Sequence, residues 1–238
     1  MWKDKMLLKL SDKTAYCRDD LLHLFLEEKP DLSASAFRWT LYNLLQEQKI
    51  FRVDYDTYIT EKPQVLPIYK PYYSDNAKAL TKTMTERFPQ VNFVIFESVL
   101  LNEFLNHQIA QNTIYVQIEK DVSSYIFDNL KEEHAGNVLY KPGKMDFDRY
   151  WTRDCVVVMD LISQAPLSQE KSHEITIEKM LVDIVAEKSI AAVFSPSEIP
   201  LVYENAMRSY QVDRRKMNRY AGRRGKALIV KEYMGDVD

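Results

Sequence analysis

Residues 33–60 read SASAFRWTLYNLLQEQKIFRVDYDTYIT, and they carry the strongest fold signal in the chain. The first half predicts a helix that begins at the N-cap Ser33 and ends near Gln48, because apolar residues recur there at spacings of three and four. The second half predicts a hairpin, since short β-rich runs at 50–53 and 58–60 flank a polar turn. A helix followed by a hairpin is the expected centre of the N-terminal domain.

Two further helices are expected upstream of this stretch. Residues 3–10 predict a short helix, and residues 18–28 predict a longer one with Asp19 and Asp20 in its first turn, where the helix dipole favours acids. Pro30 ends the second helix. Three helices followed by a hairpin is the order of a winged helix-turn-helix, which we expect over residues 1–62.

Downstream, the proline-rich residues 63–72 predict a linker, and helices alternate with strands over residues 73–238. Helices are expected at 75–87, 98–106, 122–133 and 177–188, and through most of 198–224. Strands are expected at 91–96, 113–119, 138–140 and 155–161. The expected fold class is therefore α/β (α+β): a winged helix-turn-helix followed by an α/β domain with a basic, helical C-terminal end.

Composition excludes several classes of protein and site. The chain has two cysteines and four histidines without ligand spacing, so we expect neither a disulfide framework nor a metal site. No phosphate-binding loop, G-x-S-x-G or H-E-x-x-H motif occurs, and we expect no cofactor. No apolar run reaches the ~18 residues that a membrane helix needs, and the first residues lack a signal-peptide core. We expect a cytoplasmic protein.

Charge is concentrated near the C-terminus. Residues 207–226 contain eight basic side chains and one acid, so this stretch carries a charge of +7. Because the net charge of the whole chain is −3, the remaining residues together carry −10. Such a stretch is typical of phosphate binding. The predicted contacts are Arg214, Arg215, Lys216, Arg219, Arg223, Arg224 and Lys226. Two alternatives stay open: a solvated face paired with the acidic remainder of the chain, or a docking surface for an acidic protein.

The helix that begins at Ser33 is expected to read double-stranded DNA. If Phe37, Leu41, Leu44 and Leu45 are buried, the side chains that face outward are Ser35, Arg38, Trp39 and Tyr42. Arg38 can fork to guanine, and Ser33 and Ser35 can reach phosphate. The hairpin tip argues the other way, because Asp54 and Asp56 would repel phosphate. A winged helix used only for protein contact therefore stays open.

An enzyme is the remaining alternative. Asp160 ends an apolar strand, which is where nucleases and nucleotidyltransferases place metal ligands. Glu119 and Asp121 follow another strand, so a paired metal-dependent site is conceivable. The Gly-Ser motif that a nucleotidyltransferase needs is missing, and Asp160 more readily caps a loop. We expect no enzyme.

Four stretches resemble the AbiEi-type antitoxins of type IV toxin–antitoxin (abortive infection) systems. They are the hairpin at 50–59; the unit at 93–118 with ESVLLN at 97–102 and NTIYV at 112–116; ITIEKMLVD at 175–183; and YAGRRG at 220–225. The resemblance implies a DNA-binding regulator that represses its own operon at its own operator. It also implies an antitoxin that counters a nucleotidyltransferase toxin without a stable complex.

The residues of the third stretch by themselves indicate a structural role. Ile177, Leu181, Ile184 and Val185 predict a buried stripe. We expect Glu178–Lys179 to be an exposed pair near the start of the helix and Asp183 to lie on its polar side.

Overall fold

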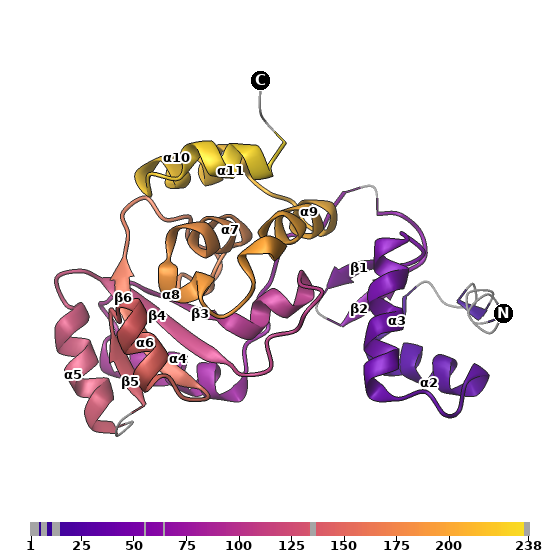
Figure 1. Cartoon of the computed structure of the whole chain (residues 1–238), viewed down its shortest axis with the longest axis horizontal. Helices are drawn as coiled ribbons and strands as arrows, with labels where there is room; N and C mark the ends of the chain where they lie inside the picture. The colour runs from indigo at the N-terminus through magenta and orange to yellow at the C-terminus, as the bar shows by residue number, and fades with distance from the viewer. Residues whose placement is uncertain are drawn as a thin grey trace. The chain divides into compact units, whose positions relative to one another are not determined.

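A computed structural model describes residues 5, 9–10, 15–54, 56–63, 65–133 and 137–235 (Figure 1). The helix expected at 3–10 lies largely outside the described residues. The chain divides into two compact units. The first comprises residues 1–70 with 209–211, and the second comprises residues 71–208 with 212–238.

Two helices form the centre of the first unit, and both confirm the sequence prediction. Helix α2 spans Arg18–Glu28 and begins in a capping box, in which Cys17 and Asp20 satisfy each other's backbone N–H groups. Helix α3 spans Ala34–Gln46 and is capped by Ser33, whose Oγ accepts from the N–H of Ala36 at 3.2 Å. Both helices begin where a side chain accepts from a backbone N–H group of the first turn, because these groups have no acceptor within the helix.

The predicted hairpin is present, with strands shifted by one residue. Strand β1 (Phe51–Asp54) pairs antiparallel with β2 (Thr57–Ile59), and the register shifts between Arg52 and Asp54. Tyr58 also exchanges backbone hydrogen bonds of 2.8 Å with Tyr16. The hairpin therefore closes onto the segment before α2, over a shared core that includes Leu21, Phe25, Phe37, Leu41, Leu44, Ile50 and Tyr58.

A four-stranded sheet organises the second unit, so the chain is a mixed α/β protein with two small sheets. The strand order is β3–β4–β6–β5, formed by Phe93–Glu97, Thr113–Glu119, Cys155–Leu161 and Val138–Tyr140. Strands β4, β6 and β5 are parallel, and β3 is antiparallel to β4. Three of these four strands have the expected bounds.

Helices connect and cover the strands. They are α4 (Asp75–Arg87), the 3₁₀ helix η1 (Ser98–Glu103), α5 (Ser123–Glu133), α6 (Lys144–Tyr150), α7 (Ile177–Ala186), α8 (Lys188–Ala191), η2 (Pro196–Glu198), α9 (Ile199–Ser209), α10 (Arg214–Arg223) and α11 (Ala227–Tyr233). Within the described residues, every helix falls short of the length and apolarity needed to cross a bilayer.

The helix predicted at 98–106 is wrong in type and length. A 3₁₀ helix ends at Glu103, because Asn102 exchanges side-chain hydrogen bonds with the backbone of Ile109 and turns the chain there. The helix predicted through 198–224 is likewise interrupted. Residues 210–213 separate α9 from α10.

Both faces of the sheet are covered. From one face, Tyr115 donates to the carbonyl of Ser189 in α8, and Gln117 donates to Asp183 in α7. The other face carries Ile114, which lines a hollow together with Leu80 of α4. Strand β4 is consequently buried along nearly its whole length rather than alternating in exposure, as expected for a strand between two helical layers.

Candidate nucleic-acid interface

Helix α3 divides cleanly into a buried and an exposed face. Phe37, Thr40, Leu41 and Leu44 are buried. The opposite face carries the predicted residues Ser35, Arg38 and Trp39, all exposed, with Tyr42 half-buried beside them. We call Ser35, Arg38, Trp39 and Tyr42 the α3 outer face. Trp39 is 61% exposed, which is unusual for a large aromatic side chain and suits a contact surface.

Two of the predicted α3 residues also serve the helix itself. Ser33 is the N-cap, and its Oγ lies 3.1 Å from the Oγ of Ser35. Arg38 donates from Nε to the carbonyl of Ala34 at 3.2 Å, so its guanidinium lies over the first turn of α3. This position brings a planar cation to the helix end that enters the groove in helix-turn-helix proteins.

Asp56, in the hairpin turn, is explained by the fold. Its Oδ1 accepts a hydrogen bond of 2.9 Å from the backbone N–H of Arg18, the first residue of α2. The carboxylate thus satisfies a helix N-terminus, where the helix dipole favours negative charge. The side chain of Asp54, the other acid expected at the tip, lies outside the described set.

Helix α10 brings most of the predicted C-terminal cations to one surface. Met217, Tyr220 and Ala221 are buried, whereas Arg215, Lys216, Arg219 and Arg223 are exposed on the opposite side. We call these last four residues the cationic face. Their spacing of three and four residues places them along one side of the helix. Arg214 is also exposed, and Gly225, at φ +66°, turns the chain out of α10.

Several predicted cations, including two of the cationic face, have partners within the second unit. Arg224 forms an ion pair with Glu187, and its side chain is only 9% exposed, so it does not belong to the cationic face. Lys216 lies 3.6 Å from Asp213, Arg223 donates from Nε to Ser163 at 2.8 Å, and Lys226 is half-buried. In the described part of the chain, Lys216 has a carboxylate partner, whereas no ion pair is recorded for the exposed Arg215, Arg219 and Arg223.

Lys179 corrects a prediction. The sequence predicted an exposed Glu178–Lys179 pair, but Lys179 is fully buried and lies 2.6 Å from the Oδ2 of Asp183, which is itself 1% exposed. Burial lowers the pKa of Lys179, and the carboxylate of Asp183 opposes this shift. Residues 179–184 of this helix are all buried, and Lys179 donates to Gln117 of β4 and Tyr220 of α10, which are distant in sequence.

Two carboxylates of the alternative enzyme site, those of Asp160 and Glu119, form hydrogen bonds or ion pairs with other side chains. Asp160 accepts from the Nζ of Lys141 at 2.7 Å and from the Oγ of Ser123 at 2.8 Å. Glu119 accepts from Asn92 at 2.6 Å. Within the described residues, no three His, Cys, Asp or Glu side chains converge as metal ligands would.

We predict that wild-type protein gives no saturable Mn²⁺ binding by isothermal titration calorimetry, because the ammonium of Lys141 lies against the carboxylate of Asp160. Asp160→Asn serves as the matched variant. Binding in the wild type that disappears in Asp160→Asn would instead support the metal-dependent enzyme.

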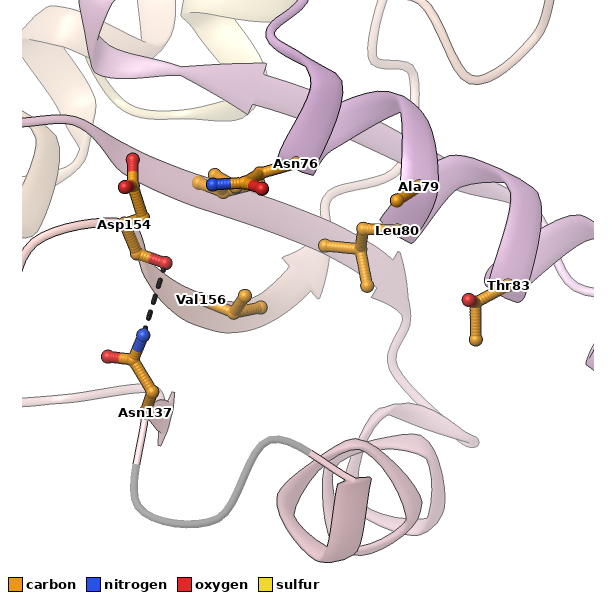
Figure 2. Close-up of a pocket in the computed structure, with 8 residues that line it drawn as sticks. Asn76, Ala79, Leu80, Thr83, Asn137, Asp154 and Val156 are labelled. Atoms are coloured by element: carbon orange, nitrogen blue, oxygen red, sulfur yellow. Dashed lines mark hydrogen bonds between the residues drawn. The ribbon is translucent and has the colours of Figure 1, made fainter.

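A hollow of about 240 Å³ lies beside α4, at the amino ends of the parallel strands. Figure 2 shows Asn76, Leu80 and Thr83 on one side and Asp154, Asn137 and Val156 on the other. The Nδ2 of Asn137 donates to the carbonyl of Asp154 at 3.4 Å. Open α/β sheets bind ligands at the carboxyl ends of their strands, so this hollow is at the opposite edge.

Residues 36–237 match a family of unknown function, DUF6577. The chain belongs to DUF6577. The match begins inside α3 and includes Arg38, Trp39, Tyr42 and all of α10, but not Ser33 or Ser35.

No curated protein matches the chain. A solved structure, the RV2827C protein from Mycobacterium tuberculosis, is similar at 11% identity and a TM-score of 0.27, over 100% of this chain and 82% of that one. A likeness of that size supports no assignment.

Proposed function

We propose that this protein is a DNA-binding transcription regulator whose first unit is a winged helix-turn-helix, with α3 as the recognition helix. The observation that carries the proposal is the division of α3 into a buried face and the exposed outer face with Arg38 and Trp39. A recognition helix needs an inner face that fixes it to a core and an exposed outer face that can enter the major groove. Arg38 is the residue suited to fork to guanine N7 and O6.

The cationic face of α10 supports the same proposal. Phosphate contacts supply most sequence-independent affinity, and a net-acidic protein needs a local cationic surface to make them. Four exposed cations along one side of a helix provide such a surface. In this proposal α3 supplies sequence preference and α10 supplies affinity.

The resemblance to AbiEi-type antitoxins supports a more specific role. The protein would repress its own operon by binding its own operator and would counter a nucleotidyltransferase toxin without a stable complex. Coexpression tests this part: if a nucleotidyltransferase is encoded next to the gene and stops growth when expressed alone, growth should resume when this protein is coexpressed.

DNA binding is tested by fluorescence anisotropy with the protein's own upstream DNA and a scrambled duplex, each at several salt concentrations. We expect Arg38→Ala to reduce the preference for upstream DNA by about tenfold, since a bidentate base contact discriminates by about 1–3 kcal/mol. Lys49→Ala, which removes an exposed cation beyond the end of α3, is the control and should preserve the preference.

Failure of the wild-type protein to prefer its upstream DNA at any salt concentration would refute the proposed recognition helix. The α3 outer face would then be better explained as a protein-contact surface that includes Trp39. Absence of binding to either duplex would favour an interaction module without DNA binding.

A further inference from the structure

Helices α7 and α10 pack side by side (Figure 1). Three acids of α7 and its C-cap contact residues of α10 and its two caps. The acids are Glu178, Asp183 and Glu187, at intervals of five and four residues. All three contacts lie within the second unit.

The first contact fixes the start of α10. The Oε1 of Glu178 accepts from the backbone N–H of Asp213 at 2.8 Å. Asp213 is the N-cap of α10, and its Oδ1 accepts from the N–H groups of Arg215 and Lys216 at 3.1 and 3.0 Å. Glu178 therefore holds the residue from which the cationic helix begins.

The second contact fixes the middle of α10 inside the core. The hydroxyl of Tyr220 donates to the Oδ1 of Asp183 at 2.8 Å, and the Nζ of Lys179 donates to the same hydroxyl at 3.2 Å. Gln117 donates to the Oδ2 of Asp183 at 2.8 Å and accepts from Lys179. Each of these four side chains is at most 2% exposed.

The third contact fixes the end of α10. Glu187, the C-cap of α7, forms an ion pair with Arg224, the C-cap of α10. Arg224 follows the last residue of the cationic face, so the pair lies directly beside that face. Start, middle and end of α10 are thus each held by a directional polar contact to α7.

Directional contacts supply what apolar packing lacks. The buried Met217 and Ala221 favour contact with the core, but the hydrophobic effect is non-directional. A buried ion pair is weak evidence for stability, because desolvation offsets its attraction. The pair of Lys179 and Asp183 is therefore better explained by geometry than by stability.

We infer that Glu178, Asp183 and Glu187 are positioning residues that fix the rotation of α10, so that its cationic face is presented to the phosphodiester backbone of DNA. This inference rests on the proposed DNA binding. The three residues themselves lie under α10, and they act through Asp213, Tyr220 and Arg224.

Glu178 offers a test in which charge and positioning predict opposite signs. Glu178→Ala and Glu178→Gln both remove one negative charge, but the glutamine amide oxygen still accepts from the N–H of Asp213. Charge alone predicts tighter DNA binding in both variants. Positioning predicts that Glu178→Gln binds DNA as well as or better than wild type, whereas Glu178→Ala binds about fivefold more weakly than Glu178→Gln. The salt slope of Glu178→Ala should be smaller by about one, for one lost phosphate contact.

A second measurement does not depend on DNA. Hydrogen exchange of the full-length protein should be about tenfold faster over the first turn of α10 in Glu178→Ala than in Glu178→Gln. If the wild-type protein does not bind DNA but the two variants differ in exchange as expected, the proposed function is rejected. The contact between Glu178 and the start of α10 is then still established. If the wild-type protein binds DNA but Glu178→Ala and Glu178→Gln bind it equally well, the inference is overturned. Equal hydrogen exchange of the two variants over the first turn of α10 would overturn it as well.

Discussion

Replacing Arg215, Lys216, Arg219 and Arg223 with glutamine is expected to weaken binding to every duplex by about a hundredfold at about 0.1 M salt. These four side chains form the cationic face of α10, and all four are exposed. Each phosphate neutralised by a cation releases counterions, which makes the slope of log K against log salt negative. Loss of four such contacts should make this slope less steep by roughly 3 to 4. Anisotropy titrations at several salt concentrations measure both quantities.

The matched control removes the same charge elsewhere in the second unit. Lys78, Lys82, Lys120 and Lys188 are exposed, and their replacement with glutamine changes net charge equally. This control should keep the salt slope. A loss of affinity equal to that of the α10 variant would show that overall charge, not the cationic face, governs binding. A loss restricted to the upstream sequence would show that α10 reads bases.

Local sequence signals predicted much of the fold. The bounds of α2, α4, β4, β5 and β6 match the prediction, because apolar patterns mark the elements and Pro30 and Pro89 follow the two helices. The buried and exposed faces of α3 were predicted for the same reason. These signals need only neighbours three or four residues apart.

Long-range contacts account for what the sequence did not predict. Lys179 bonds to Gln117 and Tyr220, which are 62 and 41 residues away, so no local pattern indicates its burial. The i, i+4 spacing of Lys179 and Asp183 is the one available signal, and that spacing is commoner on exposed helix faces. The ion pair of Arg224 was likewise not predicted, since its partner Glu187 is 37 residues away.

Lys179→Met is expected to reduce the free energy of unfolding of the second unit by about 3–5 kcal/mol. The substitution conserves length and apolar contacts but leaves the carboxylate of Asp183 buried without its cation. Urea denaturation can be followed by the fluorescence of Trp151, whose Nε1 donates to Thr113 in the same unit. Trp2 and Trp39 are replaced by phenylalanine in the background protein, so that Trp151 alone reports.

Two comparisons separate the lost ion pair from the lost side chain. Lys82→Met, at a lysine whose side chain is 75% exposed, should change stability by less than about 0.5 kcal/mol. Lys179→Met combined with Asp183→Leu should be more stable than Lys179→Met alone, although it carries one more substitution, because the buried charge is gone. If the double variant is instead the less stable protein, the cation of Lys179 is not what compensates Asp183.

In the expected case, the double variant should fold yet bind DNA more weakly than wild type, since Tyr220 has lost the acceptor that fixes the rotation of α10.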